Sequence, residues 1–196
     1  MSTDSELIQR SRDQPAVFGE LFTRHSRAIF RYAASRVGPE KAEDVLSNTF
    51  LAAFERRRRF DQAYESALPW LLGFASMAIR QHRRDEARHW AGYLYPVAAE
   101  SLAVVRDDAA VFAAELALVA EAVRHLAPRD RDALLLHVSA GLGYADVGRA
   151  LGIPIGTVRS RINRARAQLR EATGRTTGEK EEQTNGRVQH APVTEY

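Results

Sequence analysis

YADVGRALGIPIGTVRSRINRARAQLR, which runs from Tyr144 to Arg170, predicts two helices separated by a tight turn at Gly152. This arrangement is typical of a helix-turn-helix. In that motif the position four residues before the turn glycine must be small, because the two helices touch there, and Gly148 occupies it. Val158, six residues after Gly152, is expected to fill the space between the helices.

The second of these helices is strongly basic, with five arginines and no acidic residue between Ile155 and Arg170. At 100° per residue its apolar positions form one inward stripe, made of Val158, Ile162, Ala165 and Leu169. Side chains on the opposite side, near the start of such a helix, reach base edges in a DNA major groove. The candidate DNA contacts are therefore Thr157, Arg159, Ser160, Asn163 and Arg164.

Two questions about this helix stay open. Arg161 and Arg166 lie near the edge of the apolar stripe, where each is compatible with a phosphate contact or with an intramolecular ion pair. The alternative to DNA binding is a solvated basic helix in an ordinary bundle. The spacing of Gly148, Gly152 and Val158 argues against that alternative.

Composition narrows the class of protein. A hydrophobic content of 45% over 196 residues supports a folded core in one medium or two small domains. The net charge of +3 argues little, but residues 141–171 carry six arginines against two acidic residues. The absence of cysteine excludes disulfides, thiolate catalysis and cysteine zinc sites. The six histidines lack metal-ligand spacing, so we expect no metal, no cofactor and no enzyme active site.

Targeting signals are not evident in the sequence. The start, MSTDSELIQR, lacks the apolar segment of a signal peptide. The longest uncharged run, Ser66–Ile79, has 14 residues and is shorter than the roughly 20 that span a bilayer. We therefore expect a cytoplasmic protein without membrane insertion. The polar tail from Gly174 to Tyr196 is expected to be disordered.

The N-terminal half predicts two amphipathic helices, over residues 15–37 and 39–57, separated at Gly38-Pro39. The apolar stripe of the first contains Phe18, Leu21, Phe22, His25, Ile29 and Tyr32, which favours a core role for His25. The inward face of the second contains Ala42, Val45, Leu46, Thr49, Phe50 and Ala53. Its outward face contains Asp44, Ser47, Asn48 and Leu51. An outward leucine indicates a docking surface or is simply an exposed residue, and the spacing leaves both open.

A basic and aromatic connection follows, from Arg56 to Tyr64, before a third helix over residues 67–86. The end of that helix carries Arg80, Arg83, Arg84 and Arg88, which suit either a solvated helix end or contacts to a nucleic-acid strand. Residues 88–107 are predicted to be a linker, where Trp90, Tyr93 and Tyr95 dock on a partner or cover a core edge. Further helices are predicted over residues 109–126, 129–139, 144–151 and 155–172.

These segments resemble a known family. LAPRDRDALLLHVSAGLGYADVGRALGIPIGTVRSRINRARAQLR, which begins at Leu126, is similar to region 4 of bacterial sigma factors of the extracytoplasmic-function (ECF) class. The run from Gly156 to Arg161 and the Arg164-Ala165-Arg166 triplet match the end of the family pattern. The N-terminal half resembles region 2 at Phe18–Tyr32, Ala42–Val45, Thr49–Leu51 and Pro69–Leu72. Together the two resemblances cover roughly residues 15–88 and 116–171.

The resemblance implies an all-α fold with two small helical domains, the region 2 bundle and the region 4 helix-turn-helix, joined by a flexible linker. The expected boundaries are an N-terminal extension over residues 1–14, region 2 over 15–88, the linker over 89–108, region 4 over 109–173 and the tail over 174–196. The implied function is that of an alternative sigma factor, which binds core RNA polymerase, recognises the −10 and −35 promoter elements and promotes promoter opening. An anti-sigma factor is a further implied partner.

Residue roles also follow from the resemblance. Region 4 would place its second helix in the −35 major groove. Asp44, Ser47, Asn48 and Leu51 would contact the polymerase. The loop at Arg59–Ser66, with Arg59, Phe60 and Tyr64, would receive a flipped −10 base, and Arg80, Arg83 and Arg84 would lie along that strand. The sequence departs from the family pattern at Ser47-Asn48, Ser76-Met77 and Asn163, which puts polymerase affinity and promoter sequence in question.

The competing hypothesis is a stand-alone helix-turn-helix regulator that binds duplex DNA without polymerase. It explains residues 128–171 equally well, but it leaves the N-terminal half without a role. A regulator of this kind usually binds paired half-sites as a dimer. A sigma factor is expected to be a monomer that does not act on duplex DNA alone.

Overall fold

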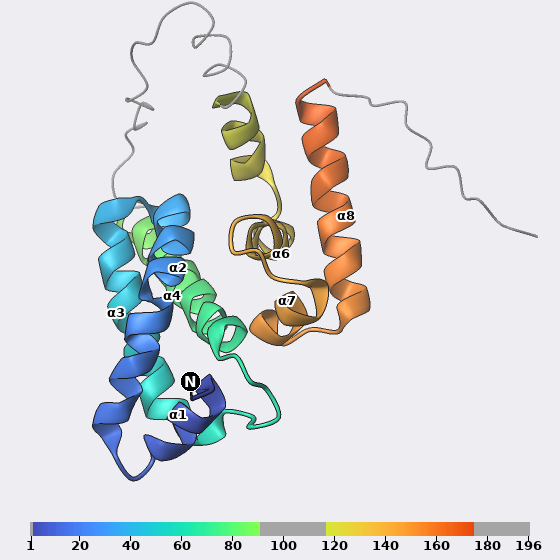
Figure 1. Cartoon of the computed structure of the whole chain (residues 1–196). Helices are drawn as coiled ribbons and strands as arrows, with labels where there is room; N and C mark the ends of the chain where they lie inside the picture. The colour runs from blue at the N-terminus through green and yellow to red at the C-terminus, as the bar shows by residue number, and fades with distance from the viewer. Residues whose placement is uncertain (1, 91–116, 175–196) are drawn as a thin grey trace, which may run out of the picture.

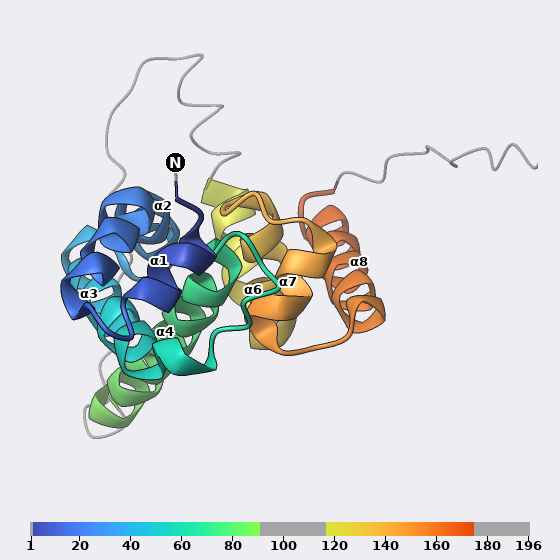
Figure 2. The ribbon, with the colours of Figure 1, turned by 60° about the horizontal axis from the view of Figure 1, so that its bottom comes forward.

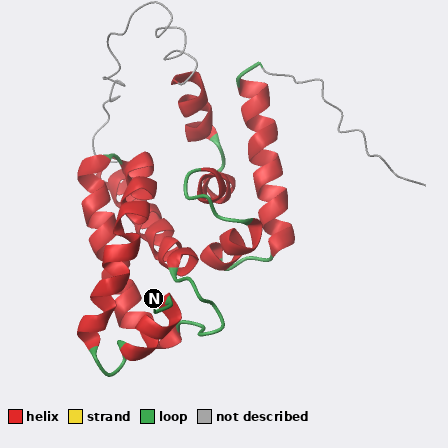
Figure 3. Cartoon of the chain, in the orientation of Figure 1, coloured by secondary structure: helices red, strands yellow, loops and turns green. Residues whose placement is uncertain are grey.

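The structure is a computed structural model and describes residues 2–90 and 117–174. Its elements are α1 (Asp4–Arg10), η1 (Pro15–Phe18), α2 (Gly19–Val37), α3 (Pro39–Arg56), η2 (Arg57–Arg59), α4 (Leu68–Trp90), α6 (Pro128–Val138), α7 (Tyr144–Leu151) and α8 (Ile155–Ala172). Residues 117–125 are also helical. No strand occurs within these described ranges (Figure 3), so the predicted all-α fold is confirmed.

In the N-terminal half, α2, α3 and α4 pack together, and α1 lies across one end of them (Figure 1). Gly38 separates α2 from α3 with a φ of 81°, a left-handed conformation that glycine adopts without a steric cost. Pro39 then starts α3 at a position where a missing N–H is tolerated. The predicted boundary at Gly38-Pro39 is confirmed.

Helix α1 lies in the segment for which the sequence predicted only an extension. Thr3 and Glu6 form a capping box at its start, and Leu7 and Ile8 are fully buried. The carboxylate of Asp4 accepts hydrogen bonds from Arg24 at 3.0 Å and from the backbone N–H of Ala67 at 2.8 Å. These contacts make residues 3–10 part of the helical bundle that α2, α3 and α4 form.

Two positions of the predicted apolar stripe on α2 differ from expectation. His25 is half-buried, and its Nε2 lies 2.6 Å from Oδ2 of Asp4, so a carboxylate holds this ring at the edge of the core. Phe22 is 46% exposed, although its ring contacts the ring of Phe50 at 4.8 Å between centroids. The stripe is therefore buried at Phe18, Leu21, Ile29 and Tyr32, and open to solvent at Phe22.

The C-terminal half contains the predicted helix-turn-helix. Gly152 ends α7 in a left-handed conformation with a φ of 65°. A Cβ atom at Gly148 would lie 2.9 Å from the carbonyl oxygen of Ile153, which explains the requirement for glycine at that position. Val158, Ile162 and Ala165 are buried and Leu169 is half-buried, so the predicted inward stripe of α8 is confirmed.

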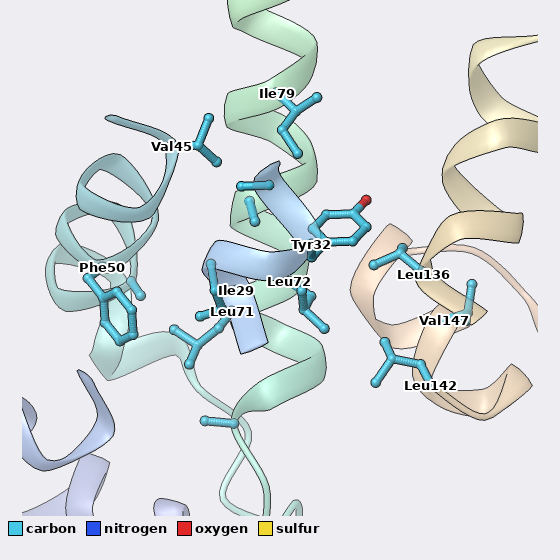
Figure 4. Close-up of a cluster of buried hydrophobic side chains, with 14 of the residues drawn as sticks. Ile29, Tyr32, Val45, Phe50, Leu71, Leu72, Ile79, Leu136, Leu142 and Val147 are labelled. Atoms are coloured by element: carbon cyan, nitrogen blue, oxygen red, sulfur yellow. The ribbon is translucent and has the colours of Figure 1, made fainter. Parts of the chain in front are cut away.

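The two halves pack against one another, mainly through α4 and α7 (Figures 1 and 2). Gly73 in α4 permits this approach, because a Cβ atom there would lie 2.6 Å from the carbonyl oxygen of Ala150. Figure 4 shows Tyr32 and Leu72 on one side of the junction and side chains from α6 to α7, such as Leu136 and Val147, on the other. The buried residues of both halves form one continuous hydrophobic cluster.

Some predicted features lie outside the described residues. These are most of the linker proposed for residues 89–108, with Tyr93 and Tyr95, the first part of the helix predicted over residues 109–126, and the tail beyond residue 174. Helix α4 extends to Trp90, four residues beyond the predicted end at residue 86.

Candidate nucleic-acid interface

The outward face of α8 contains the candidate DNA contacts. Arg159, Ser160, Asn163 and Arg164 are exposed, and Thr157 is half-buried at the first turn. Ser160 donates a hydrogen bond from Oγ to the carbonyl oxygen of Thr157 at 3.0 Å. Ser160, Asn163 and Arg164 therefore lie on the side of α8 opposite its buried stripe, and Thr157 and Arg159 lie at the flanks of that stripe.

Two arginines on this face have different surroundings. Arg164 makes a bidentate pair with Asp130 of α6, from Nε to Oδ2 at 3.0 Å and from Nη2 to Oδ1 at 2.9 Å. The hydrogen bonds that Arg164 donates to the Asp130 carboxylate raise the pKa of Arg164 above its ordinary value. Arg159 forms no ion pair within the described part of the chain. Arg164 thus links α8 to α6, whereas Arg159 is available to an external ligand.

Arg161 and Arg166 flank this face of α8. Arg161 is half-buried and Arg166 is exposed. Neither one forms an ion pair with any residue in the ranges 2–90 and 117–174. Of the two alternatives left open for them, the intramolecular ion pair has no support in the described residues.

The loop between η2 and α4 surrounds a small aromatic cavity of about 180 Å³. Phe60 is buried beneath it and meets Trp70 edge to face at 5.2 Å. Tyr64 is exposed at its rim, and the guanidinium of Arg149 from α7 lies 4.1 Å from the centre of the Tyr64 ring. Arg59 also lines this cavity. The C-terminal half therefore reaches over the loop that was predicted to receive a base.

The arginines near the end of α4 point in different directions. Arg80 donates to Oδ2 of Asp132 in α6 at 2.9 Å, and Arg83 donates to the carbonyl oxygen of Arg36 at 2.9 Å. Burial, together with the nearby charge of Arg36, lowers the pKa of Arg83. Arg84 is exposed. Two of the three α4 arginines that were predicted to lie along the −10 strand, Arg80 and Arg83, are thus held at the junction of the two halves.

A groove of about 590 Å³ lies between α3 and α4 and is lined by Asp44, Asn48, Met77 and Arg84 among others. Asp44, Ser47, Asn48 and Leu51 are all exposed, with Leu51 at 58%, which confirms the outward face predicted for α3. Sequence reasoning did not select Met77 as a contact residue, yet it is 55% exposed and lines the same groove. The sequence signal was helical periodicity, since at 100° per residue Met77 falls on the opposite side of the helix from Leu72, Ala75 and Ile79.

The described ranges hold no group of three or more histidine, aspartate or glutamate side chains that could bind a metal ion. None of the described helices is long and apolar enough to cross a membrane.

Comparison with known proteins decides the family. The family models for sigma-70 region 2 and sigma-70 region 4 match residues 21–89 and 116–169. The ECF RNA polymerase sigma factor SigC of Mycobacterium tuberculosis is 33% identical over 144 residues, which cover 72% of this chain and 75% of SigC. The chain belongs to the ECF class of RNA polymerase sigma factors. The resemblance stated from its residues is confirmed.

Other relatives span more of this sigma factor. SigM of Mycobacterium tuberculosis strain H37Rv is 34% identical over 181 residues, which cover 88% of the chain and 85% of SigM. The RNA polymerase sigma factor CarQ of Myxococcus xanthus is 30% identical over 169 residues, with 85% of the chain and 95% of CarQ covered. The role of the chain is accordingly that of an alternative sigma factor in transcription initiation.

Solved structures support the fold. CnrH, solved in complex with the cytosolic domain of CnrY, gives a TM-score of 0.63 at 24% identity, with 89% of this chain and 99% of CnrH covered. The sigma factor RpoE, solved with the anti-sigma factor NepR from Bartonella quintana, gives 0.59 at 23% identity, with 82% and 98% covered. The arrangement of helices in this ECF sigma factor is therefore one already found in sigma factors.

Proposed function

We propose that this ECF sigma factor reads the −35 element with α8 and engages the −10 strand with the η2–α4 loop and the arginines of α4. The observation that carries the proposal is the division of α8 into a buried stripe and an exposed basic face. Thr157, Arg159 and Ser160 lie in its first two turns, where side chains approach base edges most closely. Arg159, which forms no ion pair among the residues that the structure describes, is the leading candidate for base recognition.

Core RNA polymerase is proposed to bind the outward face of α3. Asp44, Ser47, Asn48 and Leu51 form one exposed strip along this helix, and an exposed leucine beside a carboxylate combines an apolar anchor with a charge. The same strip, together with the exposed ring of Phe22, is a surface that an anti-sigma factor could cover. The structural neighbour RpoE was solved with the anti-sigma factor NepR, and CnrH was solved with the cytosolic domain of CnrY.

Promoter binding by both halves requires them to separate. The −10 and −35 elements lie about 25 base pairs apart, or ~85 Å at about 3.4 Å per base pair. A compact chain of this length has a radius of gyration of only about 16 Å. Arg80 and Arg83 face the C-terminal half, and Arg149 lies over Tyr64, so separation also exposes the proposed −10 surface. We propose that the packed arrangement is the form that does not bind promoter DNA.

The decisive experiment mixes the purified chain with sigma-free bacterial core RNA polymerase, followed by gel filtration and in vitro transcription on fragmented genomic DNA of the source organism. Co-elution and discrete new transcript starts are expected. Asp44→Arg should abolish co-elution, while Glu20→Arg, an exposed charge reversal on α2, should not. A chain that does not bind the polymerase but binds duplex DNA as a dimer would instead be a helix-turn-helix regulator.

A further inference from the structure

Four arginines line a single crevice at the junction of the two halves. Arg36 comes from α2 and Arg83 from α4, whereas Arg124 lies in the helical segment 117–125 and Arg131 in α6. The crevice has a volume of about 350 Å³, and its remaining lining is small or apolar, with Ser35, Gly38, Ala120, Val123 and Leu135. Each half of the molecule thus contributes two arginines to the lining of one crevice.

Among the described residues, the arginines around the crevice outnumber the carboxylates. Asp132 is the carboxylate that meets the cluster, and it is already shared by Arg36 at 2.6 Å and Arg80 at 2.9 Å. Arg124 pairs with Glu121, but both of these side chains are exposed at the outer edge. Burial, and then the charge of Arg36, lowers the pKa of both Arg83 and Arg131. The arginines therefore repel one another in a partly desolvated space.

Two hydrogen-bond donors of the cluster also lack an acceptor within the described ranges. The Nε atoms of Arg36 and Arg131 are buried and have no acceptor among the described residues. The side chain of Arg36 is only 2% exposed. A buried donor without an acceptor destabilises a structure, because it has lost its water without a replacement. An anion in the crevice would supply acceptors to such donors and would offset the repulsion.

We propose that this crevice binds a small phosphate-bearing anion between the two halves of the sigma factor. Guanidinium groups are planar and donate two parallel hydrogen bonds, a geometry that matches the oxygens of a phosphate. The volume accommodates a phosphate or a diphosphate group but not a nucleic-acid duplex, and it lies away from the exposed face of α8. Arg83 is also one of the proposed −10 contacts, but Arg124 and Arg131, which test the assignment, are not among them.

The position of the site has a mechanical consequence. A ligand that contacts Arg36 and Arg83 on one side and Arg124 and Arg131 on the other binds more tightly when the halves are packed together. By linkage, the same ligand shifts the molecule toward the packed arrangement. A phosphate-bearing metabolite would in this way hold the two halves closed.

The test is isothermal titration calorimetry of the full chain with sodium phosphate and with pyrophosphate, against sodium chloride at equal ionic strength. Saturable binding of one anion per chain is expected. Arg124→Gln and Arg131→Gln should each weaken it about tenfold, as expected when a charge-assisted contact is lost. Arg129→Gln is the matched control, since Arg129 is exposed, lies on α6 and does not line the crevice. Thermal unfolding checks that each variant is folded. If Arg131→Gln does not fold, the test rests on Arg124→Gln, because Arg124 is exposed.

Three outcomes would overturn the proposal. The first is a phosphate response no larger than that of chloride. The second is equal phosphate affinity in Arg124→Gln, Arg131→Gln and Arg129→Gln, which would place the anion elsewhere. The third is binding of a single-stranded oligonucleotide that requires Arg124 and Arg131 and is not competed by pyrophosphate. That result would assign the cluster to nucleic acid.

Discussion

Arg36 and Asp132, which are 96 residues apart in the sequence, form a buried ion pair with 2.6 Å between Nη2 and Oδ1. The pair joins α2 of the N-terminal half to α6 of the C-terminal half. Arg36 also donates to the hydroxyl of Tyr32 at 3.2 Å, and that hydroxyl lies 2.9 Å from Oγ of Ser76. A chain of polar contacts therefore crosses the hydrophobic junction and defines how the halves meet. A buried ion pair adds little net stability compared with well-packed apolar residues, whereas the removal of one partner alone is costly.

Removal of the Asp132 carboxylate should strongly destabilise the packed form. Asp132→Ala leaves Arg36 buried without its counter-charge, and breaking a buried pair from one side costs about 3–5 kcal/mol. Urea unfolding of the full chain measures the change in free energy. Asp13→Ala, at an exposed position, is the control. Similar losses in the two variants would show that the pair does not hold the halves together.

A methyl group at position 73 should separate the halves. In Gly73→Ala the new Cβ would lie 2.6 Å from the backbone of Ala150, so α4 and α7 must move apart. The chain has no cysteine, so Arg27→Cys and Gln168→Cys allow spin labels on exposed positions of the two halves. We expect a longer and broader distance distribution. Gly156→Ala, where a Cβ meets nothing within 4 Å, should leave the distribution unchanged.

Loss of the Arg149 side chain should uncover Tyr64. The Arg149 guanidinium lies over the Tyr64 ring, and cation–π contacts at exposed sites contribute about 0.5–1 kcal/mol. Arg149→Ala is therefore expected to raise the affinity for a single-stranded −10 oligonucleotide about two- to fivefold. Fluorescence anisotropy of a labelled strand measures the change, with Arg129→Ala as the control. Unchanged or weaker binding would remove Tyr64 from the proposed −10 surface.

The two outward arginines of α8 should behave differently when truncated. Arg159→Ala is expected to weaken −35-dependent transcription with little change in thermal stability, because Arg159 makes no internal ion pair in the described ranges. Arg164→Ala should weaken transcription and also lower the melting temperature, because it breaks the pair with Asp130. Both should keep binding to core polymerase. Equal melting temperatures for the two variants would contradict this distinction.

Low pH should remove the contribution of the Asp4 carboxylate to the free energy of unfolding. Burial alone would raise the pKa of Asp4, but hydrogen bonds from His25, Ala67 and Arg24 outweigh it, and its pKa lies below the ordinary value of 3.8. A lowered pKa contributes stability that is complete above the unfolded value and is lost as the pH falls through the folded one. The difference in unfolding free energy between the wild type and Asp4→Asn should therefore shrink as the pH falls below about 4. A difference that does not change with pH would exclude this cause.

The local features of the molecule were determined by the sequence itself. The inward and outward faces of α3 and α8 follow from helical periodicity, which needs only the order of residues along one helix. The turn at Gly152 and the small residue at Gly148 follow from backbone sterics within a few residues. Even α1 has a local signal, the capping box at Thr3 and Glu6, which the prediction overlooked.

Only the tertiary structure decided how the two halves meet. The pairing of Asp132 with Arg36 and Arg80, the position of Arg149 over Tyr64 and the crevice of four arginines all join residues from different halves. Periodicity states which side chains point outward from a helix, but it does not state which outward faces come into contact. That choice depends on shape and charge at a junction between segments far apart in the chain, where Gly73 allows close approach and Asp132 supplies the buried charge.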